Sequence, residues 1–161
     1  MAYLVKDDYT ISISIDHVDQ ILTQAANNSG LTADQIRDNS EDTAEAEINA
    51  YLSANYNTAT EFAIDGAVAP TTRNKLILRC MVNLSLFNIF HTISPRDIPE
   101  MRRNLYNDCI DMLKAYRDGE LDFGLDVIDA DGDGEPDVQR TMISGSVKFN
   151  SKPFRDPITQ S

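Results

Sequence analysis

The residues with the clearest capacity for chemistry form a short acidic run near the end of the chain. The run Asp129-Ala-Asp-Gly-Asp-Gly-Glu-Pro-Asp137 alternates carboxylates with small residues. Alternate oxygens converge on one centre when a glycine, here Gly134, lets the backbone reverse sharply, and such loops bind Ca²⁺. The predicted calcium ligands are the backbone carbonyl of Glu135 and the side chains of Asp129, Asp131, Asp133 and Asp137.

This acidic run departs from the EF-hand calcium loop. The last position of an EF-hand loop requires a bidentate glutamate, and here that position is Arg140. Pro136 lies inside the run, and no clear helix follows it. We therefore do not expect an EF-hand. Two alternatives stay open: a looser calcium loop, with Ca²⁺ as the only cofactor, and a solvated acidic turn that joins the helical part to the tail.

No catalytic constellation accompanies the acidic run. The sequence contains no HExxH, GxSxG, P-loop or GxGxxG motif. Neither His17 nor His91 belongs to a metal-ligand pattern, so we expect structural or exposed roles for both. Cys80 and Cys109 each fall on an apolar helical stripe, which favours buried free thiols, with a disulfide as the alternative. We therefore expect that the protein is not an enzyme.

The net charge of −12 is divided into blocks of opposite sign along the chain. Residues 1–70 carry twelve acidic and two basic residues, and residues 71–117 carry four acidic and eight basic ones. Residues 118–137 hold nine acidic residues and no Lys or Arg, and residues 138–161 hold four basic and one acidic. Overall acidity argues against nucleic-acid binding, which needs clustered Lys and Arg. The blocks favour head-to-tail contacts between copies, or they only make the surface soluble.

Helical periodicity predicts the elements that position these residues. Apolar residues recur at helical spacing in four stretches: 16–30, 32–56 with a pause at 38–40, 72–91 and 97–119. The alternation of Thr10 to Ile15 predicts a short strand or an extended lead-in. No run of eighteen apolar residues and no signal peptide is evident, so we expect neither a membrane span nor export. The predicted helix caps and stops are Asp16, Gly30, Thr32 with Gln35, and Asp97.

The tail after the acidic run is polar and weakly basic, with too few apolar residues to bury a core alone. We expect it to become ordered against another surface. Val147, Lys148 and Phe149 form the candidate for strand addition, and Phe149 and Phe154 are the candidate anchors, because buried aromatic side chains dominate interface energetics. The predicted interface residues are Val147, Lys148, Phe149, Lys152, Phe154 and Arg155.

The order of these pieces resembles the head–tail connector, or head-completion adaptor, proteins of tailed bacteriophages. The similarity begins at Tyr3-Leu-Val-Lys-Asp-Asp-Tyr9 and is strongest at Ala46-Glu-Ile-Asn-Ala-Tyr-Leu-Ser-Ala-Asn-Tyr56. It continues through Pro70 and a last helix that runs from Tyr106 to Leu121, with a fainter likeness over 149–156. The acidic run is an insertion that this pattern does not explain.

The resemblance implies a mainly α fold, with a small four-helix, connector-type bundle at 1–120. The charge and polarity of the remaining residues add an acidic loop at 121–140 and an extended C-terminal arm at 141–161, with possible short strands. It also implies a structural virion protein of the phage neck, assembled in the host cytoplasm. The expected partners are further copies of itself in a ring, usually a dodecamer, the portal protein, and tail or other neck proteins. Genomic DNA would pass through the ring without specific binding. The alternative is a calcium-dependent binding module.

Overall fold

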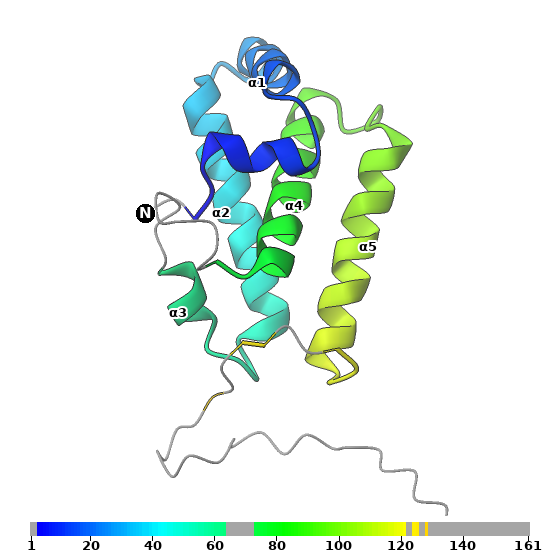
Figure 1. Ribbon diagram of the computed structural model, residues 1–161. Helices are drawn as coiled ribbons and strands as arrows, with labels where there is room; N and C mark the ends of the chain where they lie inside the picture. The colour runs from blue at the N-terminus through cyan, green and yellow to red at the C-terminus, as the bar shows by residue number, and fades with distance from the viewer. Residues whose placement is uncertain (1–2, 64–72, 122–123, 126–127, 129–161) are drawn as a thin grey trace, which may run out of the picture.

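The structure, a computed structural model, describes residues 3–63, 73–121, 124–125 and 128. These residues form helices and no strand, so the prediction of a mainly α fold is confirmed. Helices α2, α4 and α5 run side by side, with α4 between the other two in this view, and α1 crosses one end of the bundle (Figure 1). The elements are the 3₁₀-helix η1 (Lys6–Ile11) and the α-helices α1 (Ile15–Ser29), α2 (Ala33–Leu52), α3 (Thr58–Phe62), α4 (Lys75–Ile93) and α5 (Glu100–Arg117).

Helix α4 is the central helix of the bundle. It contacts α1, α2, α5 and η1, and apolar residues on most of its sides are buried. Contrary to the sequence-based expectation, α4 is long and apolar enough to cross a membrane by length and composition. Its burial by four neighbouring elements is typical of the core helix of a globular bundle. Its buried apolar residues are Ile77, Leu78, Cys80, Met81, Val82, Leu84, Leu86 and Ile89.

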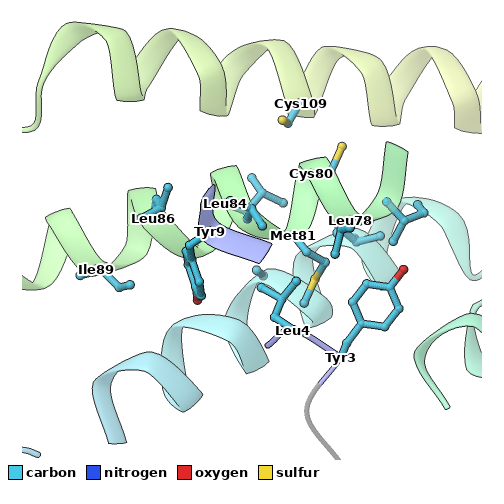
Figure 2. Close-up of a cluster of buried hydrophobic side chains, with 14 of the residues drawn as sticks. Tyr3, Leu4, Tyr9, Leu78, Cys80, Met81, Leu84, Leu86, Ile89 and Cys109 are labelled. Carbon is cyan, nitrogen blue, oxygen red and sulfur yellow. The ribbon is translucent and has the colours of Figure 1, made fainter. Parts of the chain in front are cut away.

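The N-terminal segment completes this core. Figure 2 shows Tyr3, Leu4 and Tyr9 gathered with buried side chains of α4. The ring of Tyr3 also meets the Phe62 ring edge-on, with 5.2 Å between the ring centroids. At the other end of the chain, Tyr56 and Tyr116 stack at 4.3 Å and bring the end of α5 to the segment that follows α2. Residues from both ends of the described chain therefore share one core.

The predicted signals at the junction of α1 and α2 are confirmed. Gly30 ends α1 with φ of +74°, a left-handed conformation that glycine adopts without strain. Thr32 and Gln35 form a reciprocal capping box: the Gln35 N–H donates to Thr32 Oγ1 at 3.2 Å, and the Thr32 N–H donates to Gln35 Oε1 at 3.0 Å.

We predict that Thr32→Ala lowers the free energy of unfolding by about 1 kcal/mol, because the Gln35 N–H loses its acceptor at the start of α2. Urea titration followed by circular dichroism measures the change. Thr23→Ala is the matched control, since Thr23 is exposed within α1 and donates only to the Asp19 carbonyl of its own helix. Equal losses in the two variants would contradict a specific capping role for Thr32.

Several predicted boundaries were wrong. Residues 10–15 form no strand, because η1 buries Tyr9 and the Val5 N–H donates to the Asp8 carboxylate at 2.7 Å. Helix α2 does not pause at 38–40: the Ser40 hydroxyl donates to the Ile36 carbonyl at 2.7 Å, so it stays satisfied inside the helix.

Capping residues and one loop also differ from the prediction. The α1 cap is Ser14 rather than Asp16. The α5 cap is Pro99 rather than Asp97, whose carboxylate instead accepts the Ser94 hydroxyl at 3.1 Å. The stretch expected to be a loop after Tyr56 contains the short helix α3, which buries Phe62. The bundle therefore has one more α-helix than predicted.

Candidate functional site

The site residues predicted from the sequence lie outside the described part of the chain. This holds for the calcium ligands Asp129, Asp131, Asp133, Glu135 and Asp137, and for the arm residues Val147, Lys148, Phe149, Lys152, Phe154 and Arg155. Within the described ranges, no three His, Cys, Asp or Glu side chains gather closely enough to hold a metal ion. The features that stand out in the described bundle are instead a buried polar network, a groove and two surfaces of opposite charge.

The centre of the buried polar network is the ion pair between Asp8 and Arg73. The Arg73 guanidinium donates to both carboxylate oxygens of Asp8, at 2.7 and 2.9 Å, and to the Tyr3 carbonyl at 2.8 Å. The side chains of Arg73 and Asp8 are 0% and 7% exposed. The hydrogen bond to Asp8 raises the pKa of Arg73, so the guanidinium stays charged inside the protein. The pair fastens the N-terminal segment to the residue that precedes the α4 cap.

Glu61 extends this network to α3. Its carboxylate accepts the Tyr3 hydroxyl and also the Asn74 backbone N–H, the latter at 2.8 Å. Burial, followed by the hydrogen bond to Glu61, raises the pKa of Tyr3. Asn74 in turn caps α4, because its side-chain oxygen accepts the N–H groups of Leu76 and Ile77. The start of α4 is thus held by α3 and by the N-terminal segment together.

A second buried carboxylate, Glu41, lies on α2. It accepts the Tyr9 hydroxyl at 2.8 Å, and Arg37 Nε lies 3.8 Å from the same oxygen. Burial raises the pKa of Glu41 to about 7, despite the opposing effects of Tyr9 and Arg37. Glu41 therefore changes its charge near neutral pH while it is in contact with a fully buried tyrosine.

Ser12 joins the N-terminal segment to α4 and α5. Its hydroxyl donates to Asn83 Oδ1 at 2.7 Å, and its carbonyl accepts Arg102 Nη2 at 3.1 Å. Arg102 is 5% exposed, and burial lowers its pKa. The guanidinium of Arg102 also lies over the Phe90 ring, 6.0 Å from its centroid. The polar groups of this network hold the N-terminal segment in place, which is a structural task.

The two cysteines face each other across α4 and α5. Figure 2 shows the Cys80 side chain directed toward Cys109. Both residues are buried and free, so the prediction of buried free thiols is confirmed. A hydrogen bond to Cys109, together with burial, raises the pKa of the Cys80 thiol, which keeps it protonated and unreactive. The pair behaves as part of the core.

Sequence reasoning missed the charged members of this network. One signal for Glu41 was present: it falls on the apolar stripe of α2, three residues before Ala44 and seven before Ile48, both of which are fully buried. No local signal identifies Arg73, because its partners Asp8 and Tyr3 lie more than sixty residues earlier in the chain.

A groove lies between the N-terminal half of α2 and the C-terminal half of α4. Its volume is about 250 Å³. Ile36 is buried, whereas Leu31 is 41% exposed at the loop before α2. The polar residues of its lining include Asn39 and Thr43 from α2 and Asn88 and His91 from α4. The groove thus combines a small apolar floor with hydroxyl and amide groups.

The described surface separates the two signs of charge. Helix α2 carries six acidic residues and one basic residue, and Asp34, Asp38 and Asp42 among them are exposed. Residues 73–117 carry eight basic and four acidic residues. Four of the exposed bases there make no ion pair with any described residue: Lys75, Arg79, Arg96 and Arg103.

Comparison with known proteins identifies the family. The family model described as "Bacteriophage Mu, Gp36" matches residues 3–140, which include the whole described bundle and the acidic run. No curated protein and no solved structure matches the chain. The match is to a phage protein family, which supports the expected phage origin and a virion-associated role. Because it covers most of the sequence, the chain belongs to the bacteriophage Mu Gp36 family.

Proposed function

We propose that the protein is a structural virion protein that forms a ring between the portal and the tail of a tailed phage. In this role it extends the DNA channel and provides a docking surface for the tail. Membership of a phage protein family supports the setting, and a rigid helical bundle suits a structural subunit. Its place is the neck of the virion, which it reaches after assembly in the host cytoplasm.

The observation that carries the ring proposal is the separation of charge between α2 and residues 73–117. A ring requires heterologous contacts, in which one patch of each copy meets a different patch of the next. The acidic α2 and the exposed bases Lys75 and Arg79 of α4 form such a complementary pair, and complementary fields fix the orientation and register of partners. In our proposal the α2 surface of each copy contacts the α4–α5 edge of its neighbour.

The overall charge fits the passage of DNA. A net charge of −12 repels the phosphate backbone, so a ring of these subunits gives DNA little to bind. The remaining proposed partners are the portal protein on one side and tail or other neck proteins on the other. In our proposal the C-terminal arm, residues 141–161, makes contacts between subunits or with the portal, because it has too few apolar residues to bury a core alone.

Paired charge reversals test the ring. We expect a chain with Asp38→Lys and Asp42→Lys not to assemble, because positions 38 and 42 then carry the same sign of charge as Lys75 and Arg79 of the neighbouring copy. A second chain, with Lys75→Glu and Arg79→Glu, is also expected not to assemble, because positions 75 and 79 then carry the same sign of charge as Asp38 and Asp42 of the neighbouring copy. A mixture of the two is expected to assemble with alternating copies, since each contact again joins opposite charges. Mass photometry and negative-stain microscopy measure the assemblies.

Asp16→Lys with Gln20→Lys is the control, because these exposed α1 residues change the net charge by a similar amount outside the proposed contact. Circular dichroism verifies that each variant is folded. Normal rings from either reversed chain alone, or no rings from wild-type protein in the presence of its portal, would refute the proposed contact.

A further inference from the structure

We infer that the groove between α2 and α4 is the docking site for the C-terminal arm, residues 141–161, of a neighbouring copy. This inference rests on the proposed ring, and it names the surface that the arm contacts. The groove and the arm are complementary in size, in hydrogen-bonding groups and in charge.

The size of the groove favours a single side chain over a typical small-molecule ligand. The groove volume of about 250 Å³ is below the roughly 300–1,000 Å³ of most ligand pockets. A single large side chain suits this space, with Ile36 and Leu31 as its apolar contacts. The arm offers two such side chains, Phe149 and Phe154. An aromatic anchor in a small pocket is the usual energetic centre of a protein interface.

The groove lining also suits an extended backbone. An incoming peptide brings N–H and C=O groups that need partners when they leave water. The side chains of Asn39 and His91 make no hydrogen bond to any other described residue, so they are free to bond such a peptide. Asn88 and Thr92 are already used in part: Asn88 Nδ2 donates to the Ser40 carbonyl at 3.5 Å, and the Thr92 hydroxyl donates to the Asn88 carbonyl at 3.1 Å.

Charge favours the arm over other segments of the chain. The arm contains Lys148, Lys152 and Arg155 and one acidic residue, Asp156. Asp38 and Asp42 are exposed on α2, next in sequence to the groove residues Asn39 and Thr43. A basic segment that carries two aromatic residues therefore meets acidic side chains beside a small apolar floor.

The exit point of the chain allows the arm to reach a neighbour. The Ile128 N–H donates to the Asn55 carbonyl at 3.3 Å, just beyond the C-terminal end of α2. The groove lies toward the opposite end of α2, a helix of 20 residues and about 30 Å. Residues 129–149 span up to roughly 70 Å when extended, so the arm can cross to the next copy. The acidic α2 surface, which the ring proposal places at that contact, borders the groove.

Disulfide trapping between singly substituted full-length chains tests this assignment. A chain with Thr43→Cys is mixed with a chain with Ser151→Cys, and the mixture is exposed to oxidised glutathione. We expect a covalent product that contains one chain of each kind. The native Cys80 and Cys109 are buried and do not compete. The matched control pairs Ser151→Cys with Gln24→Cys, an exposed position on α1, and is expected to give no product above background.

Three results would overturn the inference. Rings that form normally without the mixed disulfide would remove the groove as the docking site but leave the proposed ring intact. A disulfide that forms only within a chain carrying both Thr43→Cys and Ser151→Cys would assign the groove to the arm of the same copy. If no ring forms, a synthetic peptide of residues 141–161 is titrated against the full chain. We expect binding that weakens about tenfold in Asn39→Trp and is unchanged in Gln24→Trp, and equal binding to both variants would overturn the assignment.

Discussion

Replacing Arg73 with methionine is expected to lower the free energy of unfolding by about 3–5 kcal/mol, because the change leaves a buried carboxylate without its partner. Asp8 is only 7% exposed, and it loses both guanidinium bonds. The Tyr3 carbonyl loses its donor in the same step. Urea titration of wild type and variant at neutral pH measures the difference. A domain of this size has only about 5–15 kcal/mol of stability in total, so the variant would be close to unfolding.

Two controls make the Arg73 experiment specific. Arg79→Met removes an exposed arginine of α4 that makes no ion pair with any described residue, and we expect a change within about 0.5 kcal/mol. The double variant Asp8→Leu with Arg73→Met removes both charges and should recover part of the lost stability, since no unpaired charge remains. Recovery is incomplete because Asp8 also accepts the Val5 N–H. A loss in Arg73→Met no larger than in Arg79→Met would show that the pair is not buried in solution.

The second large effect is a pH dependence of stability that originates at Glu41. Its pKa is about 7 in the folded protein and about 4.5 when exposed, so the folded state holds this proton more tightly than the unfolded state does. The stabilising effect of the bound proton is complete below pH 4.5 and is lost as the pH rises through 7. By proton linkage, the free energy of unfolding therefore falls by about 3 kcal/mol as the pH rises from the unfolded-state pKa of Glu41 to above its folded-state pKa.

Glu41→Gln removes this dependence. The glutamine oxygen still accepts the Tyr9 hydroxyl, but no charge is buried at alkaline pH. We expect the variant to match wild type near pH 4 and to exceed its stability by about 3 kcal/mol at pH 8. Asp42→Asn is the control for the loss of one negative charge from α2. Asp42 is exposed and is the smallest of the causes given for the raised pKa of Glu41, so most of the pH dependence should remain in this variant. Parallel pH profiles for wild type and Glu41→Gln would contradict the assignment of this dependence to Glu41.

Local sequence signals predicted the features of the fold that depend on local interactions. The stop at Gly30 and the capping box at Thr32 involve residues within a few positions of each other. The 3.6-residue period identified the long helices for the same reason. Tyr9 shows where this approach failed. The burial of Tyr9 depends on contacts with Glu41 and α4, which are distant in sequence. The polar–apolar alternation after Tyr9 predicted a strand, whereas these tertiary contacts favour the 3₁₀-helix η1.

The buried charges were beyond prediction from a single sequence. Asp8 lies in an acidic, exposed-looking stretch, and only the approach of Arg73 makes its burial possible. The groove could not be predicted from the sequence either, because its shape depends on how α2 and α4 pack against each other. The family match reaches the acidic run but does not test its predicted calcium ligands, so that hypothesis still depends on residue spacing alone.

The burial of Tyr3, Leu4 and Tyr9 against α4 has a consequence for synthesis on the ribosome. Their packing partners on α4 and the guanidinium that neutralises Asp8 are translated more than sixty residues later. A nascent chain that lacks α4 has α1 and Glu41 of α2 to contact its N-terminal segment but cannot complete the core around it. Contacts so distant in sequence are slow to form, so we infer that the N-terminal segment reaches its native packing only after α4 has been translated.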